Sequence, residues 1–295
     1  LNGSAVPSSE ADGRAFSFDI IPSSNIDNMM IIKSPTAELP GDFSGGFIKI
    51  STKNMPDENS LSLSVGTGIN TVTHFKDFSL LQSSSTEWLG FDRCARPLSK
   101  DFPSHLGSMT DPSQITYYTK TGFNNDWNVK TFRPLPDLKL NLTWNRKIGD
   151  KVGTILTFGY SNANKTIPDM QNTRYGIYSA TADVPTIEKN YIDNQFTNEV
   201  KINAMNNWSF ILDSRNRFEF RNLFSQIGKN RFTERYGTST VSGEYYENQT
   251  EMLYSSRLSY VGQLAGLHTL DEDMTQTLNW TVDYSYANKM EPDRR

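Results

Sequence analysis

The sequence predicts a mostly β protein, namely part of a transmembrane antiparallel β-barrel preceded by part of a small mixed α/β domain. Three observations support this prediction. Segments after residue 59 alternate between apolar and polar residues, the connections between them alternate between short and long, and aromatic residues gather near the segment ends. Alternation with a period of two places apolar side chains on one face of a strand and polar side chains on the other.

The composition agrees with a thin apolar surface rather than a large buried core. Hydrophobic residues make up 36% of the 295 residues, aromatic residues reach 12%, and the mean hydropathy is -0.56. A disordered chain would be poorer in aromatic and β-branched residues, so we expect this chain to fold. No apolar run reaches the roughly 18 residues of a transmembrane helix. The net charge of -4, without a basic tract, argues against nucleic acid as a partner.

Residues 1–54 differ from the rest of the chain and form the first predicted domain. Two short strands are expected, from Ile26 to Lys33 and from Phe47 to Lys53, and a helical turn is expected to begin at Asn25. Between them lies a Pro/Gly-rich turn segment at 35–46. Short strands mixed with turns indicate a small α/β unit.

Residues 55–295 form the second predicted domain, which consists of long strands. Four segments alternate clearly between an apolar or aromatic set and a small polar set: 60–66, 138–145, 156–161 and 278–286. Three more are less regular: 200–212, 217–227 and 252–266. Asn206 and Asn222 interrupt the apolar set in two of them. The total is about seven strands, each near the ~9–11 residues that a tilted strand needs to cross a bilayer.

Short and long connections follow one another in turn. The short ones are Gly149–Lys151, Asp213–Asn216 and Asp271–Met274. The long ones are 70–136, 162–196 and 228–250. Bacterial outer-membrane barrels combine short periplasmic turns with long extracellular loops. If residues 1–54 lie on the periplasmic side, every long connection becomes an extracellular loop.

A soluble β-sandwich is the alternative, because its strands also alternate between apolar and polar residues. Sandwich strands are shorter, and their inner faces favour Val, Ile and Leu. Short and long connections also do not alternate regularly along a sandwich chain. In this chain the apolar set contains many aromatic residues: Trp144, Tyr160, Trp208, Tyr260, Trp280, Tyr284 and Tyr286. Aromatic girdles at the two lipid interfaces explain that placement, so the pattern favours the membrane barrel.

The first 54 residues also resemble a known family. The run Pro7-Ser-Ser-Glu-Ala-Asp-Gly-Arg-Ala-Phe-Ser-Phe-Asp-Ile-Ile-Pro22, preceded by Asn2-Gly, resembles part of the plug domain of TonB-dependent outer-membrane receptors. The same is true of Ser24-Asn-Ile-Asp-Asn and of Pro35-Thr-Ala-Glu-Leu-Pro-Gly-Asp-Phe-Ser-Gly-Gly46. Phe47-Ile-Lys-Ile-Ser-Thr-Lys53 looks like the closing strand of such a plug. The resemblance beyond residue 54 is one of pattern only.

The resemblance implies a 22-stranded barrel around a plug that rearranges when the TonB protein pulls from the periplasm. It implies TonB, outer-membrane lipid and a scarce nutrient as partners: a siderophore, a cofactor, a glycan or a peptide. A surface lipoprotein is a further partner in this family. The chain lacks the first plug half, the TonB-contacting segment and most of the barrel, so both ends are read as cuts in a longer protein. Its plug ending differs from the Tyr-Gly form of gut glycan importers, which favours the general receptor class.

Two groups of residues are candidates for function. The plug motif contains Arg14, Pro40, Gly41, Asp42, Gly45 and Gly46. Its glycines permit backbone conformations and close approaches that a Cβ would block, its proline fixes a turn, and its aspartate can cap backbone N–H groups. The long connections contain Trp88, Tyr117, Tyr118, Trp127, Tyr175 and Tyr178. These rings could stack on a ligand, or they could pack the loops together.

No enzyme, cofactor or metal site is expected. The chain contains no His-Glu-x-x-His, Cys-x-x-Cys, Gly-x-Ser-x-Gly or phosphate-loop motif. His74, His105 and His268 lack the spacing of metal ligands, and the single Cys94 cannot form an internal disulfide. The sequence therefore predicts an outer-membrane receptor for active nutrient import, with a β-rich surface adhesin or binding module as the alternative.

Overall fold

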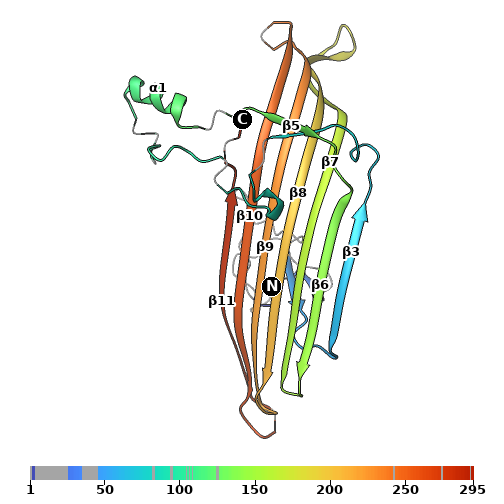
Figure 1. Ribbon diagram of the computed structural model, residues 1–295, viewed down its shortest axis with the longest axis vertical. Coiled ribbons are helices and arrows are strands. Elements are labelled where there is room, and N and C mark those ends of the chain that lie inside the picture. The colour runs from blue at the N-terminus through green and yellow to red at the C-terminus, as the bar shows by residue number, and fades with distance from the viewer. Residues whose placement is uncertain are drawn as a thin grey trace.

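The computed structural model describes residues 2–3, 26–34, 46–81, 84–93, 96–103, 105, 107, 109–123, 126–241, 243–273, 275–292 and 294–295. This part of the chain is mostly β and is built around one large antiparallel sheet (Figure 1). None of its helices is long and apolar enough to cross a membrane.

The large sheet has seven strands, as the alternating segments predicted. They are β3 (Ser60–Gly68), β6 (Asp137–Ile148), β7 (Val152–Ser179), β8 (Val184–Ile211), β9 (Asn216–Ser239), β10 (Tyr245–Thr269) and β11 (Thr277–Met290). Each strand pairs with the next in the order β3-β6-β7-β8-β9-β10-β11, always antiparallel. The sheet is open, with β3 and β11 at its edges.

Smaller elements lie outside the large sheet. They are the hairpin of β1 (Ile26–Ile32) and β2 (Phe47–Thr52), the two-stranded ribbon of β4 (Phe78–Leu81) and β5 (Val129–Phe132), the short 3-10 helix η3 (Glu87–Leu89) and the helix α1 (Pro112–Thr121). Asp111 caps α1 by accepting a hydrogen bond from the N–H of Ser113, and Pro112 occupies its first turn. In Figure 1, α1 stands away from the large sheet.

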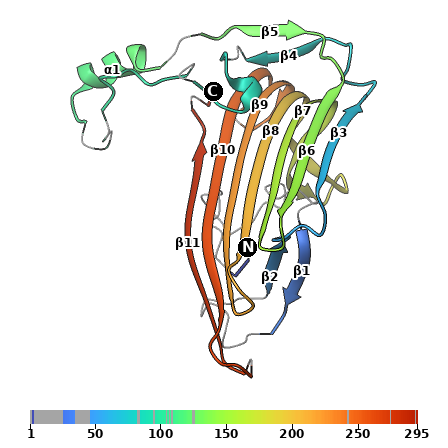
Figure 2. The same cartoon turned by 60° about the horizontal axis from the view of Figure 1, so that its bottom comes forward.

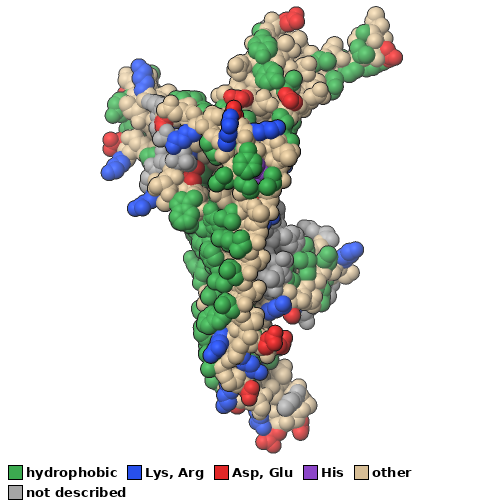
Figure 3. All heavy atoms as spheres, turned by 45° about the vertical axis from the view of Figure 1, so that its right-hand side comes forward, with side chains coloured by type: hydrophobic (Ala, Val, Ile, Leu, Met, Phe, Trp, Pro, Cys, Tyr) green, Lys and Arg blue, Asp and Glu red, His purple; other side chains and the backbone are tan. Residues whose placement is uncertain are grey.

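The strand register gives the sheet two unlike faces. One row across the sheet joins Leu63, Leu142, Phe158, Ala204, Phe224, Tyr260 and Tyr286. Even-numbered residues of β6, β8, β9, β10 and β11 share this face, which we call the apolar face. Many of its side chains on the edge strands are exposed, for example Leu63 at 68% and Val282 at 64%, whereas Val200, Phe232 and Met252 on the central strands are buried. Figure 3 shows hydrophobic side chains in a band along the sheet, with charged side chains near both ends.

The opposite face, which we call the hairpin face, carries small and polar residues on β3 and β6 and packs against the β1–β2 hairpin. Ile50 of β2 is 3% exposed and forms one buried cluster with Ile155, Met205, Leu223 and Val261 of the sheet. Figure 2 shows the hairpin beside the end of the sheet that carries the short turns. Burial of Ile50 contributes about 1.5–3 kcal/mol to this contact.

A second segment, residues 78–81 and 84–93 together with Arg96, packs on the apolar face closer to the other end of the sheet. Phe78, Leu80 and Leu81 form a buried cluster with Phe232 and Met252. Gly90 adopts a left-handed conformation (φ +79°), and its backbone lies directly against Gly228. A Cβ added to Gly228 would lie 2.5 Å from the Cα of Gly90. The approach of the two backbones therefore requires glycine at position 228.

The three short connections occur as predicted. Residues 149–151 join β6 to β7, with Gly149 at φ +61°. Asp213 closes the turn between β8 and β9 by accepting hydrogen bonds from the side chain of Asn216 and from the N–H groups of Arg215 and Asn216. These bonds, that from the Asn216 side chain foremost, hold the pKa of Asp213 below its ordinary value. Asp271 plays the same part before β11.

Two of the three connections that were predicted as long loops consist mostly of strand. Residues 162–179 continue β7, residues 184–196 belong to β8, and residues 228–239 and 245–250 belong to β9 and β10. We call these extensions the arms. Both faces of the arms carry polar residues, so the period-two apolar signal that identified the other strands is absent there. Backbone pairing with the neighbouring strand extends them nonetheless. The third long connection, 70–136, contains β4, η3, α1 and β5.

The helical turn expected from Asn25 is also wrong within the described residues, because Ile26–Ile32 is strand throughout. This segment pairs antiparallel with β2 from Ile26–Thr52 to Ile32–Phe47. The run of four apolar residues from Met29 to Ile32, which includes the β-branched Ile31 and Ile32, favours extended pairing over a turn.

Candidate functional site: the contact between the hairpin and the sheet

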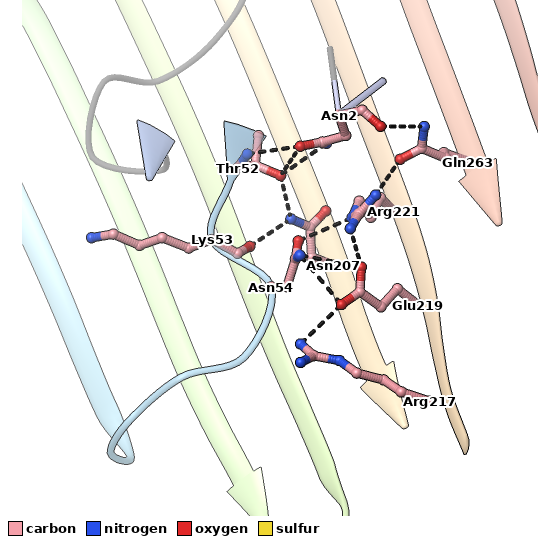
Figure 4. Close-up of polar contacts among 9 residues, drawn as sticks. All are labelled: Asn2, Thr52, Lys53, Asn54, Asn207, Arg217, Glu219, Arg221 and Gln263. Carbon is pink, nitrogen blue, oxygen red and sulfur yellow. Dashed lines mark hydrogen bonds and ion pairs between the residues drawn. The ribbon is translucent and has the colours of Figure 1, made fainter. Parts of the chain in front are cut away.

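Polar residues form a continuous contact where the chain leaves β2 and crosses toward β3. We call this contact the seam, and it consists of Asn2, Thr52, Lys53, Asn54, Asn207, Arg217, Glu219, Arg221 and Gln263 (Figure 4). Four of these come from the N-terminal part of the chain, and five come from β8, β9 and β10. The sheet residues are all odd-numbered, so they all project from the hairpin face.

The first half of the seam is neutral. The Asn207 amide donates to the carbonyl oxygen of Lys53 at 2.9 Å and to the Thr52 hydroxyl at 3.2 Å. Thr52 in turn donates its backbone N–H to the side chain of Asn2 at 2.8 Å. Thr52 and Asn207 are 4% and 2% exposed, so these bonds are made out of contact with bulk water. Buried polar groups need such partners, which explains why the contact is so fully bonded.

The second half of the seam is charged. Glu219 forms ion pairs with Arg217, at 2.9 Å, and with Arg221. Asn54 donates to Glu219 at 3.1 Å and accepts from Nε of Arg221 at 2.9 Å. Arg221 also donates to Gln263, whose amide donates to the carbonyl oxygen of Asn2 at 3.3 Å. One arginine thus links the end of the hairpin with two strands of the sheet.

The energetics of the seam suit a contact that opens and closes. Each neutral hydrogen bond contributes only about 0.5–1.5 kcal/mol, because water replaces it when the contact opens. The cluster of five buried hydrophobic residues that includes Ile50 adds a small apolar part. Among the described residues, the hairpin is therefore held against the sheet by one small apolar cluster and by polar contacts that are each weak.

Most of the predicted plug-motif residues cannot be placed. Arg14, Pro40, Gly41, Asp42 and Gly45 lie outside the described residues. Gly46 is described and directly precedes β2. An added Cβ there would meet only the carbonyl oxygen of Ile32, at 3.9 Å, which is an ordinary contact. Among the described residues, Gly46 therefore shows no close approach that a Cβ would block.

The predicted aromatic residues of the long connections fall into separate groups. Tyr117 and Tyr118 lie on α1 with their rings 5.3 Å apart, and Phe102 packs edge-on against Tyr118. The Trp127 ring lies 4.5 Å below the guanidinium of Arg295. Such packing matches the alternative in which the rings stabilise the connections.

Trp88, Tyr175 and Tyr178 lie elsewhere. Trp88 belongs to η3, and its carbonyl oxygen accepts a hydrogen bond from Tyr160 on the apolar face. Tyr175 and Tyr178 lie at the far end of β7, where the Tyr178 hydroxyl bonds to Asp183. Hydrogen bonding to Asp183 raises the pKa of Tyr178. The structure thus does not bring the six predicted aromatic residues into one site.

Sequence reasoning missed the sheet side of the seam. Arg217, Glu219 and Arg221 were visible as charges at every second position of a strand, on the side opposite to Phe218 and Phe220. Charged residues at every second position of a strand indicate that this face of the strand contacts water or other polar groups. Nothing in the sequence indicated that Asn54 or Asn2 would be the partner, because 165 residues separate Asn54 from Glu219.

His74 and His268 form hydrogen bonds to neighbouring side chains of the fold. His74 is buried and bonds to Asp137 at 3.1 Å, while His268 lies between Asn216 and the Trp280 indole, which donates to it at 3.0 Å. Within the described residues, no group of three His, Cys, Asp or Glu side chains is placed to hold a metal ion.

Comparison with protein-family models, with curated proteins and with solved structures finds no significant match to this chain.

Proposed function

We propose that the chain is part of an outer-membrane receptor that imports a scarce nutrient with energy from TonB. In this proposal the large sheet is a section of a barrel wall, the apolar face meets lipid, and the hairpin belongs to a plug inside the lumen. The observation that carries the proposal is the sidedness of the sheet: an exposed apolar face on one side, and a hairpin bound through polar contacts on the other.

The dimensions of the apolar face support a bilayer-crossing wall. The paired part of β6 and β7 runs from Leu138–Asn162 to Ile148–Val152. At about 3.3 Å per residue this part is roughly 33 Å long. A strand tilt of about 40° reduces its height to about 25 Å, which is the height of the apolar band in outer-membrane barrels.

The two ends of the sheet support an orientation. One end carries the three short turns and the hairpin, and the other carries the arms and the 70–136 connection. Short turns face the periplasm in bacterial barrels, so the hairpin would lie toward the periplasm, from which TonB acts. The seam would then be the contact that yields when TonB pulls. An enzyme, a cofactor and nucleic acid have no part in this proposal, and a surface lipoprotein remains a possible additional partner.

Orientation is tested by labelling single cysteines in intact cells in a Cys94→Ser background. Ala182→Cys lies in the turn between β7 and β8, and Asp150→Cys in the turn between β6 and β7. We expect a membrane-impermeant maleimide to label Ala182→Cys from outside, and Asp150→Cys only after permeabilisation. Equal labelling, or recovery of the protein without detergent, would contradict the membrane wall and favour a surface adhesin.

The import step is tested with a thiol beneath the hairpin. Met205 is 2% exposed and belongs to the same buried hydrophobic cluster as Ile50 of the hairpin. We expect Met205→Cys to react faster with a small maleimide in energised cells than in cells lacking TonB. Ala182→Cys is the matched control, which should react equally in both. A TonB-independent rate at Met205→Cys would contradict the proposal that TonB moves the hairpin.

A further inference from the structure

Basic residues are concentrated on one face of the three central strands. All residues of β8, β9 and β10 are described, and their odd-numbered positions project from the hairpin face. Eight basic residues occupy this face: Lys189, Lys201, Arg217, Arg221, Lys229, Arg231, Arg235 and Arg257. Five acidic residues share it: Asp193, Glu199, Glu219, Glu247 and Glu251. On the apolar face the same strands carry only Glu188 and Glu234.

This sign is opposite to that of the whole chain, whose net charge is -4. A face that was merely polar would reflect the average composition and would be slightly acidic. The excess of basic residues is therefore a property of this face, and not of the sequence as a whole.

The acidic residues beyond the seam are held by neighbours on the same face. Asp193 accepts two hydrogen bonds from Arg235, at 2.8 and 2.7 Å. Three further contacts complete the set: Glu199 with Lys201 at 2.9 Å, Glu251 with Arg231 at 2.9 Å, and Glu247 with the Tyr191 hydroxyl. The carboxylates thus orient basic side chains, and their own charge is largely compensated.

Because eight basic residues face five acidic ones on these strands, the face keeps a net positive charge after these pairings. Lys189 and Arg235 both lie over the Tyr191 ring, at 5.8 and 5.2 Å from its centroid. Lys229 pairs across the strands with Ser255 on β10. We call the hairpin-face side chains of Lys189, Lys201, Lys229, Arg231, Arg235 and Arg257 the basic wall.

We infer that the basic wall selects an anionic solute, one that carries several carboxylate or phosphate groups. The inference rests on the proposed function, because the wall lines a passage only if the sheet is a section of a barrel. Guanidinium and ammonium groups gathered on one face attract oxyanions and raise their local concentration. The solute would meet this wall before it reaches the hairpin.

The test measures the electrostatic potential at the wall in the purified, intact protein. Ser255→Cys, in a Cys94→Ser background, places a thiol opposite Lys229. Its reaction rates with an anionic and a cationic methanethiosulfonate are compared with those of a free thiol. We expect a preference for the anionic reagent of about tenfold. The preference should shrink in the double variant Lys189→Gln/Lys229→Gln and at 1 M salt, where screening shortens to about 3 Å.

Thr250→Cys is the matched control, because Thr250 lies on the apolar face of the same strand opposite Glu234. It should show no preference for the anionic reagent. Citrate and pyrophosphate, each matched with KCl at equal ionic strength, then serve as carboxylate and phosphate probes. At least one of them should slow labelling of Ser255→Cys more than KCl does, and the stronger of the two identifies the preferred group.

Equal rates for the two reagents at Ser255→Cys, or protection no better than that of KCl, would overturn the inference. Neither result would contradict the proposed function, because labelling of the purified protein requires neither TonB nor transport. Conversely, a TonB-independent rate at Met205→Cys would overturn the proposed import, and with it the role of the wall in selecting cargo.

Discussion

Asn207 on β8 donates a hydrogen bond to the carbonyl oxygen of Lys53 at 2.9 Å, where the chain leaves the β1–β2 hairpin. The two residues are 154 positions apart in the sequence. The same amide also reaches the Thr52 hydroxyl, so one buried side chain holds the end of β2 against the sheet. Four predictions follow from contacts of this kind.

Loss of the Asn207 amide should loosen the hairpin without unfolding the sheet. Asn207→Ala leaves the Lys53 carbonyl and the Thr52 hydroxyl without this donor, at a cost of about 1–3 kcal/mol. Hydrogen exchange should therefore accelerate at the amides of Phe47–Thr52, while the amides of β8–β10 stay protected. Asn206→Ala is the control, because Asn206 lies on the opposite face of the same strand. Equal acceleration in both variants would rule out the role assigned to Asn207.

An arginine introduced on the apolar face should lower the free energy of unfolding far more than an arginine introduced on the hairpin face. Leu140→Arg would place a guanidinium on the apolar face, beside Tyr160, and in a bilayer should lower the free energy of unfolding by up to about 2–4 kcal/mol, which is the cost at the bilayer midplane. Asn141→Arg, one residue further on, points to the hairpin face and should cost much less. Urea unfolding in lipid vesicles, followed by tryptophan fluorescence, measures both. Similar losses would show that the faces are assigned wrongly.

The buried ion pair between Glu87 and Arg96 should contribute more to stability than an exposed ion pair of the same connection. Arg96 bonds to Glu87 at 2.8 Å, and their side chains are 3% and 8% exposed. Glu87 also accepts from Asn230 on β9 at 3.1 Å. Glu87→Gln should release the segment around Glu87 from the sheet at a cost of about 1–3 kcal/mol, which limited proteolysis detects.

The exposed pair between Arg133 and Asp77 is the comparison for that variant. Its side chains are 72% and 76% exposed, so Asp77→Asn should change stability by less than about 1 kcal/mol. If proteolysis of the segment after β4 responded equally to both substitutions, burial of the Glu87–Arg96 pair would not be what holds it.

The arms should weaken in acid because of Asp193, which lies in the arm of β8. Hydrogen bonds from Arg235 hold the pKa of Asp193 below its ordinary value, against the opposing effect of burial. A depressed folded-state pKa means that the stabilisation is complete above the unfolded pKa of about 3.9 and is lost as the pH falls through the folded value.

Hydrogen exchange of the arm amides, corrected for its intrinsic pH dependence, measures this loss. Asp193→Asn should show faster exchange than the unmodified chain at pH 7, and the difference should shrink as the pH falls below about 3.9. Glu234→Gln removes a neighbouring carboxylate on the apolar face and should leave the pH dependence unchanged. A pH dependence that persists in Asp193→Asn would assign the effect to another group.

The long strands, their number and the short turns were predictable because each depends on local information. Period two in 138–145 or 278–286 follows from one apolar face, and Asp213 or Gly149 supplies its turn chemistry within four residues. The arms were not predictable, because both of their faces are polar and the pairing of neighbouring strands alone extends them.

The sequence by itself determined which side chains share a face, since alternation along a strand leaves no other choice. It therefore fixed the contrast between Leu140 and Asn141, and the charged row Arg217, Glu219, Arg221. Only the tertiary structure decided what each face meets. The pairing of Asn54 with Glu219, of Lys53 with Asn207 and of Gly90 with Gly228 joins segments more than 130 residues apart. Contacts at that separation depend on how the sheet and the hairpin pack together, and no local pattern encodes them.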